Sequence, residues 1–375
     1  MSETPSETAE VPFLQTDFER ITTLVSTEFQ LEEALLEHNI PTYYLKQPQE
    51  TKQAFLKLLK NFETVNLTAI LRRPDGRIVL KIIPKPPTKR SNILINWLLF
   101  FATIVTTFIT GYMLSEDLTD PIIGGATFTV AIMAVLGTHE MGHKITANRK
   151  GIEATPPYLI PGPPPIFGGF GTFGAVIMQK SLAPNKDALF DVGASGPIVG
   201  FIIAVIATIA GLPFSVYGWV PRGSPTLPVP MLFRLVAPFL LPPSETFPPY
   251  PGPNYDPVVF LHPVAVAGWV GMIVTMLNLL PAAMLDGGHV SRSLFGERTR
   301  TILTILSIIS LILVSPIMAI FVMFLSMQKH PGPLDDVSSL STNRKLFAIV
   351  LVVIFVLSSF FYDFFLSLLE SLFAL

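Results

Sequence analysis

IIGGATFTVAIMAVLGTHEMGH, residues 122–143, has no ionisable side chain before His139. A helix of about 20 apolar residues spans the hydrocarbon core of a bilayer, so this stretch predicts a membrane-spanning helix. It ends in three ionisable residues, His139, Glu140 and His143. A charged side chain at membrane depth costs about 2.5–3.5 kcal/mol on insertion scales, so such groups usually belong to a functional site.

The composition of the whole chain agrees with a membrane protein. Of its 375 residues, 50% are apolar and only 14% are charged, far from the balance of soluble domains. A net charge of −2 gives no basic surface for nucleic acid. The absence of cysteine excludes disulfides and thiolate ligands, so a transition metal must be bound by histidine and carboxylate. Residues 1–13 are acidic and polar, which predicts no cleavable signal peptide.

The apolar pattern predicts an all-α polytopic membrane protein with about six transmembrane helices. A proline- and glycine-rich apolar segment, Leu159–Met178, is predicted to be a membrane-embedded β-hairpin or re-entrant element, because such backbone must be sheltered by protein. Residues 213–257 are rich in proline and aromatic residues, which is typical of an interfacial loop or lid. The predicted spans are Ile93–Leu114, Ile122–His143, Leu189–Ala210, Val258–Leu280, Ile302–Met327 and Leu346–Leu368.

Residues 1–90 have a different pattern and predict a small soluble α+β domain. FQLEEALLEH (29–38) and QETKQAFLKLLKNF (49–62) are amphipathic and favour helices. NLTAILRRPDGRIVLKIIP (66–84) has two apolar runs around a Pro-Asp-Gly turn, which predicts a β-hairpin. The basic, proline-containing stretch KPPTKR then separates this domain from residues 91–375, the membrane domain, with a boundary near Arg90.

The distribution of basic residues predicts the orientation in the membrane. Three clusters of Lys and Arg fall on one side of the predicted spans. The basic residues of the loop 328–345 fall on the opposite side and weakly oppose this orientation. With an even number of spans, both termini and the N-terminal domain are expected in the cytoplasm, with the polar ends of the second and fourth spans near the same side. The clusters are Lys85, Lys89 and Arg90; Lys144, Arg149 and Lys150; and Arg292, Arg298 and Arg300.

The HEMGH motif at the end of the second span predicts a zinc site. His139 and His143 are four residues apart, so on a helix they project from one face and can bind one metal ion. Glu140 between them can then act as general base toward water, the role that HExxH gives its glutamate in metalloproteases. The motif also arises by chance in unrelated chains, but its position at the end of an apolar span favours the metal site.

Two histidines leave a catalytic zinc ion one protein ligand short. Asp286 in NLLPAAMLDGGH follows the fourth predicted span on the same side as HEMGH, and Pro281 and the two glycines after Asp286 would allow a tight turn. On the residues alone, an ordinary solvated aspartate in a helix-terminating turn explains Asp286 equally well. His38, His262 and His330 lie in segments predicted to be distant.

HEMGH on one spanning helix and NLLPAAMLDGGH at the end of another together resemble the site-2 proteases, the intramembrane zinc metalloproteases of M50 type. The resemblance implies one zinc ion per chain bound by His139, His143 and Asp286, with Glu140 as the catalytic acid and base. It also implies a substrate or oxyanion contact for Asn278, whose amide could instead hydrogen-bond helix ends. Among these proteases the chain is similar to archaeal, cyanobacterial and plastid members, because residues 213–257 are too short for a PDZ domain.

Further segments fit the same resemblance. Gly171, Thr172, Phe173 and Gly174 match the membrane-embedded hairpin, which is expected to bind an unwound substrate strand. GASGPIVG (193–200) matches a small-residue helix start. Close helix packing explains the glycines in both segments at least as well. In HPGPLDDV (330–337), similar to a segment of the same members, Asp335 and Asp336 are predicted to form turns rather than bind metal.

The predicted function is hydrolysis of peptide bonds in or near transmembrane segments of membrane proteins, within the lipid bilayer. The substrate helix must unwind locally, because a helix hides its carbonyl groups in hydrogen bonds. Two alternatives remain from the sequence, a divalent-metal transporter and a non-proteolytic scaffold. Transport predicts ionisable groups along a path through the bilayer, whereas here they gather at one depth, and a scaffold would be expected to have a damaged motif. The oligomeric state stays open.

Overall fold

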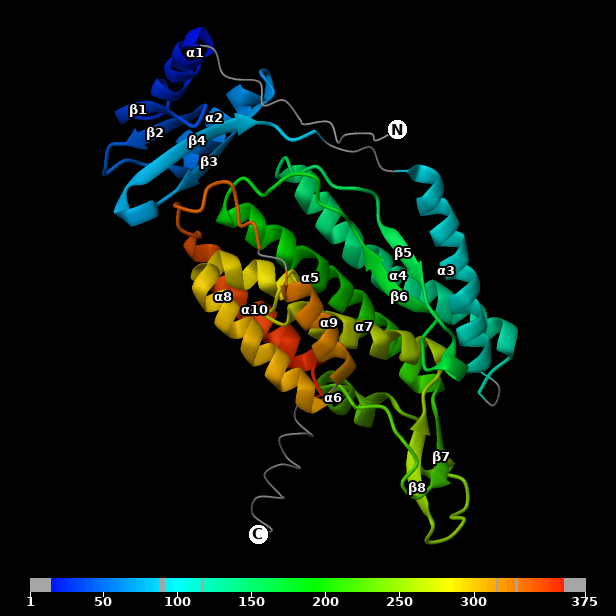
Figure 1. The fold of residues 1–375 in the computed structure, drawn as a ribbon. Helices are drawn as coiled ribbons and strands as arrows, with labels where there is room; N and C mark the ends of the chain where they lie inside the picture. The colour runs from blue at the N-terminus through cyan, green and yellow to red at the C-terminus, as the bar shows by residue number, and fades with distance from the viewer. Residues whose placement is uncertain (1–14, 88–91, 116–117, 315, 328–329, 361–375) are drawn as a thin grey trace, which may run out of the picture. The chain divides into compact units, whose positions relative to one another are not determined.

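The computed structural model describes residues 15–87, 92–115, 118–314, 316–327 and 330–360, and the chain forms two compact units (Figure 1). The first unit contains the described part of the N-terminal region together with two short segments from later in the chain, Leu182–Lys186 and Gly332–Ser339. The second contains the rest of the described chain. The boundary predicted near Arg90 falls at residues 88–91, outside the described residues.

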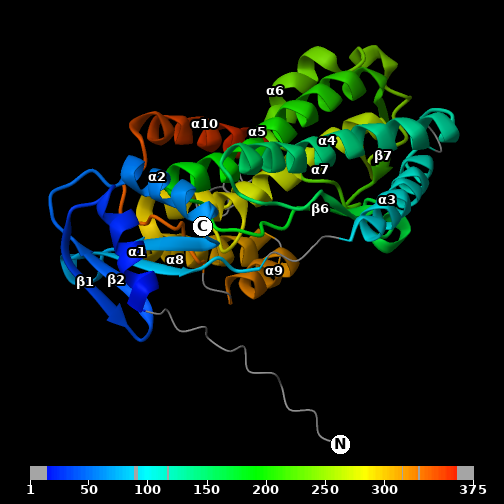
Figure 2. The ribbon, with the colours of Figure 1, turned by 90° about the horizontal axis from the view of Figure 1, so that it is seen from above.

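The first unit is a four-stranded antiparallel sheet in the order β1-β2-β4-β3 with two helices (Figure 2). Its core packs Val25 of α1 and Phe55, Leu58 and Phe62 of α2 against buried side chains of the sheet such as Leu80. The predicted hairpin of residues 66–84 is confirmed, with β3 and β4 joined around Pro74–Gly76. The elements are α1 (Gln15–Ser26), β1 (Leu31–Glu37), β2 (Ile40–Leu45), α2 (Lys52–Glu63), β3 (Leu67–Arg72) and β4 (Ile78–Pro84).

One local prediction in this unit is wrong. Residues 49–62 do form a helix, α2, but FQLEEALLEH forms strand β1 rather than a helix. His38 and Asn39 have φ of 49° and 63°, the left-handed backbone of a two-residue hairpin turn. This turn pairs Ala34 with Tyr43 of β2. Sheet pairing therefore overrides the helical periodicity of the segment.

The later segments extend this sheet beyond β3. Leu71 N–H donates to Leu334 O (2.9 Å), and Asp335 N–H donates to Pro184 O (3.0 Å). Asp335 is fully buried and accepts hydrogen bonds from the backbone N–H groups of Val337 and Ser338 (both 2.9 Å). It therefore acts as a turn former, as predicted.

In the second unit, three helices of the described chain are long and apolar enough to cross a membrane. They are α3 (Ile93–Met113), α4 (Pro121–Arg149) and α5 (Lys186–Gly211), which continues as a short 3₁₀ turn to Phe214. Their composition makes the chain an integral membrane protein. Asp120 caps α4 by accepting hydrogen bonds from Ile122 N–H (2.9 Å) and Ile123 N–H (3.2 Å), and Pro121 occupies the first turn, where no N–H is needed.

The other three predicted spans differ from single long helices. Val258–Phe260 belong to strand β8 (Tyr255–Phe260), and helix α7 (Pro263–Leu279) begins only after His262. Ile302–Met327 is divided between the end of α8 (Asp286–Val314) and α9 (Pro316–Ser326). Pro316, the first residue of α9, lacks the backbone N–H that a continuous helix requires. The last prediction overlaps α10 (Thr342–Ser358), and its residues 361–368 lie outside the described residues.

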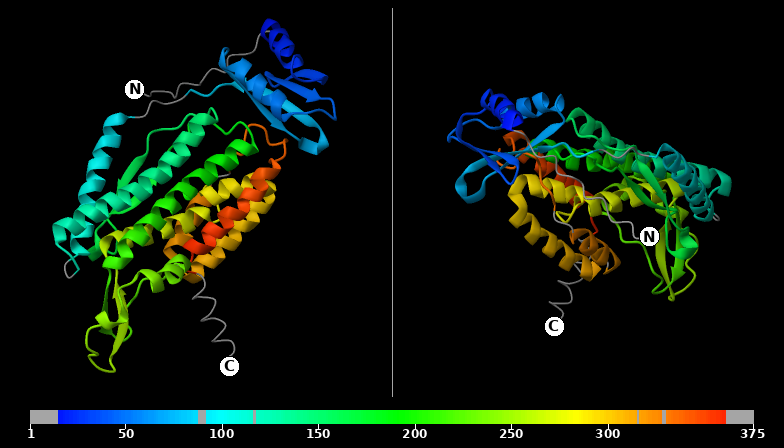
Figure 3. Two further views of the ribbon diagram at one scale, coloured as in Figure 1. Left: turned by 180° about the vertical axis from the view of Figure 1, so that it is seen from behind. Right: turned by 45° about the horizontal axis from the view of Figure 1, so that its top comes forward.

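The predicted hairpin within Leu159–Met178 is present as β5 (Tyr158–Pro161) paired antiparallel with β6 (Thr172–Val176). The proline-rich segment 213–257 contains β7 (Val216–Pro221), which pairs with β8, and helix α6 (Met231–Leu240). Helices α4, α5 and α7 run beside one another (Figure 3). Phe128 and Ile132 of α4 pack in one core with Trp269 and Met272 of α7.

Candidate metal centre

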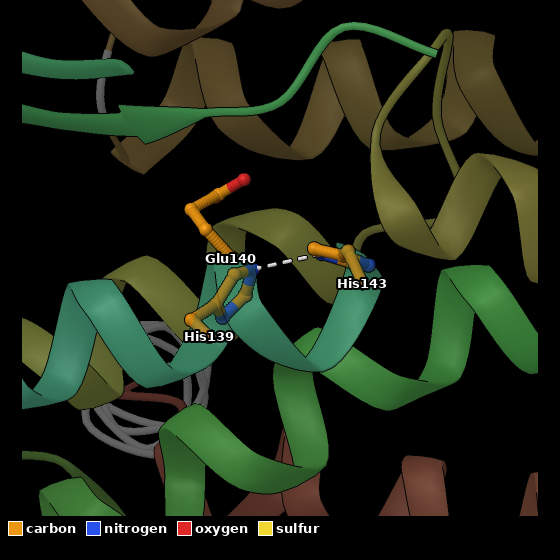
Figure 4. A group of neighbouring side chains, drawn as sticks. All are labelled: His139, Glu140 and His143. Atoms are coloured by element: carbon orange, nitrogen blue, oxygen red, sulfur yellow. Dashed lines mark hydrogen bonds between the residues drawn. The ribbon is translucent and has the colours of Figure 1, made fainter. Parts of the chain in front are cut away.

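His139 and His143 lie one turn apart near the C-terminal end of α4, and both are buried. Their Nε2 atoms are 3.2 Å apart and their ring planes meet at 71°. Figure 4 shows Glu140 projecting from the adjoining edge of the same helix. Together with Glu140 they form a group that could hold a metal ion. The i, i+4 spacing of the motif therefore produces the expected common face.

Asp286 joins this pair from the start of α8. Its Oδ2 atom is 3.3 Å from His139 Nε2 and 3.2 Å from His143 Nε2. Two ligand atoms that each lie about 2.0–2.1 Å from a tetrahedral zinc ion are about 3.3 Å apart. The three atoms thus form a nearly equilateral triangle of the size that zinc requires, and the solvated-turn interpretation of Asp286 does not fit its position.

The backbone carbonyl of Val192 on α5 fixes the orientation of the His143 ring. His143 Nδ1 lies 2.7 Å from Val192 O, and a carbonyl oxygen can only accept a hydrogen bond, so Nδ1 is the protonated nitrogen. Nε2, which faces His139 and Asp286, is then left with its lone pair. This is the arrangement by which hydrogen-bond partners prepare histidine for metal binding.

Glycines of the GASGPIVG segment let α5 approach the two rings. A Cβ added to Gly196 would collide with the His143 imidazole, and a Cβ added to Gly200 would lie 2.8 Å from His139 Nδ1. On the α4 side, a Cβ on Gly142 would be 2.8 Å from Ser195 O. The small residues are therefore required for packing directly against the candidate ligands, a contact that the sequence did not reveal.

Glu140 is buried on the adjoining edge of α4, and the backbone of Ile177 lies beside its carboxylate. Ile177 directly follows β6, so the end of the hairpin lies beside the Glu140 carboxylate. No sequence pattern predicts this position of Ile177, because a backbone group has no residue preference.

Asn278 lies near the end of α7, and its Nδ2 atom is 3.3 Å from His139 Nε2. The amide nitrogen therefore lies at the edge of the three-atom triangle, where it contacts a candidate ligand. Of the remaining histidines, His262 accepts a hydrogen bond from Val264 N–H (3.3 Å) at the start of α7, and burial lowers its pKa. His330 contacts His289 through nitrogens 2.7 Å apart.

The hairpin residues predicted to bind substrate are at the other end of β6 from Ile177. Gly171 has φ of +77°, and its carbonyl accepts a hydrogen bond from Thr106 Oγ1 of α3 (2.6 Å). Thr172 Oγ1 donates to Ile160 O (2.9 Å) across the hairpin. The Phe173 side chain is 75% exposed, and Gly174 also has a positive φ. Gly171 is thus tied to α3, whereas Phe173 points away from the protein.

Apolar helices whose buried ends bring together histidine and carboxylate groups define a membrane-embedded protein with a candidate metal site. The model of peptidase family M50 matches residues 127–246 and 253–325, just over half of the chain. The chain therefore belongs to peptidase family M50, and the resemblance to site-2 proteases is confirmed at the level of the family.

Curated relatives come from plants. "Probable zinc metalloprotease EGY1, chloroplastic" of Oryza sativa subsp. japonica is 30% identical over 60% of this chain and 39% of its own length. "Probable zinc metalloprotease EGY2, chloroplastic" and "Probable zinc metallopeptidase EGY3, chloroplastic" of Arabidopsis thaliana are 31% and 27% identical over 45% and 69% of this chain, and 29% and 48% of their own lengths. The chain thus spans less than half of each of these relatives. No solved structure matches it.

Proposed function

We propose that this chain is an intramembrane zinc metalloprotease that hydrolyses peptide bonds in or near the transmembrane segments of membrane-protein substrates. The main support is the triangle formed by His139 Nε2, His143 Nε2 and Asp286 Oδ2, with sides of 3.2–3.3 Å. These atoms come from two elements that are distant in sequence. Membership in peptidase family M50 points to the same chemistry.

His139, His143 and Asp286 would hold one zinc ion per chain, because they offer two neutral nitrogens and one carboxylate oxygen. Three protein ligands are typical of catalytic zinc, which keeps a fourth position open. When bound, zinc lowers the pKa of water and polarises the carbonyl group of the scissile bond.

Glu140 is the general base and acid of the proposed reaction. It takes a proton from the attacking water and gives it to the amine that leaves. The backbone of Ile177 lies beside this carboxylate. Asn278 Nδ2, beside His139, would donate to the oxyanion that develops on the scissile carbonyl.

The hairpin would hold the substrate in an extended conformation. A transmembrane helix must unwind before hydrolysis, and its freed backbone groups then need partners within the membrane. Residues Gly171–Gly174 at the start of β6 would supply them by edge pairing, the mode by which an extended peptide adds to a sheet. Phe173, exposed on this strand, would contact the apolar substrate side chains.

The centre is proposed to lie near the cytoplasmic side, with residues 1–90 as a soluble cytoplasmic domain and 91–375 as the membrane domain. The basic residues at the C-terminal end of α4, Lys144 and Arg149 in the helix and Lys150 directly after it, support this orientation. The cluster after α7 supports it less, because Arg292 and Arg300 are buried and bind Glu297. Cleavage would then release the cytoplasmic or membrane-proximal part of a single-span substrate.

The decisive test is Glu140→Gln in the purified full-length protein, reconstituted with a single-span substrate. The amide preserves size and the Ile177 contact but cannot take the proton, so cleavage is expected to fall by at least about 100-fold. Zinc content should be unchanged, since Glu140 is not one of the three ligands. Full cleavage by this variant would reject the assigned role, and zinc flux into vesicles that survives without any cleavage would favour the transporter.

A further inference from the structure

The loop that precedes Asp286 has a strained and buried backbone. Residues Pro281–Leu285, here called the aspartate loop, connect α7 to α8. Ala282 and Ala283 are fully buried, and Ala283 has φ of +50°, a left-handed conformation that residues with a Cβ rarely adopt. Such a conformation persists only where surrounding contacts enforce it.

The contacts that enforce it come from the second half of α8. Arg300 Nη1 donates to Ala283 O (3.1 Å), and Ala283 N–H donates to Thr304 Oγ1 (3.1 Å). Both polar groups of the left-handed residue are therefore bonded by side chains one helical turn apart. Thr304 Oγ1 in turn donates to Arg300 O (2.9 Å), which fixes the hydroxyl as acceptor for Ala283.

Glu297 holds the Arg300 guanidinium in this position. It binds Arg300 through both carboxylate oxygens, at 3.0 and 2.7 Å, and lies 3.1 Å from Arg292 Nε. Gly296, with φ of +82° and ψ of −175°, interrupts α8 just before Glu297. This break separates the part of α8 that begins with Asp286 from the part that bears Arg300. We call Glu297, Arg300 and Thr304 the Arg300 cluster.

The aspartate loop also packs directly on the first turn of α8. A Cβ on Gly288 would collide with Ala283 O, and a Cβ on Gly287 would collide with Leu279 O. The carbonyl that Arg300 binds is thus the same one against which the turn after Asp286 is packed. A shift of Ala283 would move Asp286 with it.

We propose that Arg300, with Glu297 and Thr304, is a positioning residue for the third zinc ligand. The Arg300 cluster holds the left-handed turn at Ala283 and so keeps Asp286 Oδ2 within 3.2–3.3 Å of the histidine nitrogens. This inference rests on the proposed zinc site and concerns metal affinity rather than the hydrolytic step. Burying the Arg300 guanidinium costs free energy. A glycine at position 283 would adopt the positive φ without the support of such a buried group.

The test measures zinc binding to the full-length protein in detergent micelles after removal of metal with a chelator. Arg300→Met and Thr304→Val are expected to weaken zinc binding about 10- to 100-fold, the effect of losing groups that orient a ligand. Arg300→Met leaves Glu297 paired with Arg292, so it creates no isolated buried carboxylate. Peptide cleavage should return toward the wild-type rate at saturating zinc, which a merely unfolded or misfolded protein would not show.

Three further variants complete the design. Arg298→Met, at an exposed position of the same helix, should leave zinc binding unchanged. Arg300→Lys should be intermediate, because an ammonium group cannot bind Glu297 and Ala283 O in the same fork geometry. Ala283→Gly in the Arg300→Met protein should recover part of the affinity, since glycine adopts positive φ without strain.

Unchanged zinc affinity in Arg300→Met and Thr304→Val would overturn the proposal, as would cleavage that stays low at saturating zinc. If Arg300→Met does not fold, Thr304→Val alone decides between these outcomes. His139→Ala tests the underlying site separately: zinc binding that survives this change would contradict the proposed function, whereas its loss together with full binding by the Arg300 variants would contradict only the positioning role.

Discussion

The two sides of the candidate metal centre are built by different means. His139 and His143 project from one uninterrupted helix, α4, and their spacing follows from the helical repeat alone. Asp286 comes from the junction of α7 and α8, where the chain leaves one helix, makes a left-handed turn and enters the next. The spacing of the two histidines is therefore determined locally, whereas the position of Asp286 depends on contacts made by Arg300 and Thr304.

This difference separates two kinds of sensitivity to mutation. The histidine side should tolerate changes anywhere except in α4 and in the glycines of α5 that touch the rings. The aspartate side should respond to changes such as those at Arg300, which lies fourteen positions from Asp286 along the chain. Both sides must be intact for a metal ion to have three protein ligands.

The largest effect is expected from removing a ligand on either side. His143→Ala and Asp286→Ala should each lower zinc affinity by more than the about 10- to 100-fold typical of changes beyond the ligands, and each should abolish peptide cleavage. Zinc content of the purified proteins, measured by elemental analysis, checks this. His38→Ala, in the turn between β1 and β2, and Asp256→Ala, in β8, serve as controls. Retention of zinc in Asp286→Ala would mean that the aspartate side contributes no ligand.

A smaller effect is expected where α5 packs on the histidine side. Gly196→Ala places a methyl group against the His143 ring, and overpacking of a dense core costs about 1–3 kcal/mol. The ring must shift, so both thermal stability and zinc affinity should fall. Gly137→Ala on α4 is the matched control, because a Cβ there meets nothing within 4 Å and alanine favours helix. Equal zinc affinity in the two variants would show that α5 does not constrain the ring.

Sequence patterns predicted those parts of the molecule in which one segment determines its own structure. The helices at Ile93–Met113 and Pro121–Arg149 follow from apolar length, and the common face of His139 and His143 follows from helical spacing. The hairpin of residues 66–84 follows from its turn residues. In each of these elements the physical signal lies within about 20 residues.

The parts that the sequence did not reveal depend on contacts between separate elements, whatever their separation along the chain. The groups of Val192 and Ile177 that lie beside His143 and Glu140 belong to the backbone. Every residue type has them, so a sequence pattern cannot predict these contacts. The residues of β1 have a helical pattern, but pairing with β2 decides their structure. Ala283 is the clearest example, because alanine gives no indication of the positive φ that Arg300 and Thr304 enforce.

An ionic cluster at the far end of the histidine side gives the smallest expected effect on the centre. Arg344 of α10 binds Asp191 of α5 through two hydrogen bonds of 2.6 Å and binds Asp187 at 3.0 Å. Lys150, which directly follows α4, lies 2.7 Å from the same Asp191. The cluster therefore links α4, α5 and α10 beyond the turn that bears His143.

Arg344→Lys should lower stability without changing the metal site. Lysine cannot reproduce the two parallel bonds to Asp191, and loss of a charged hydrogen bond costs about 1–3 kcal/mol. The apparent melting temperature in micelles should fall by about 2–4 °C for each kcal/mol, with Lys345→Ala, at the exposed neighbouring position, as control. Zinc affinity should stay within about twofold of wild type, because the contacts of this cluster are to Asp187, Asp191 and Lys150 and not to either histidine ring. A parallel fall in zinc affinity would contradict local determination of the histidine side and would make it as dependent on distant contacts as Asp286.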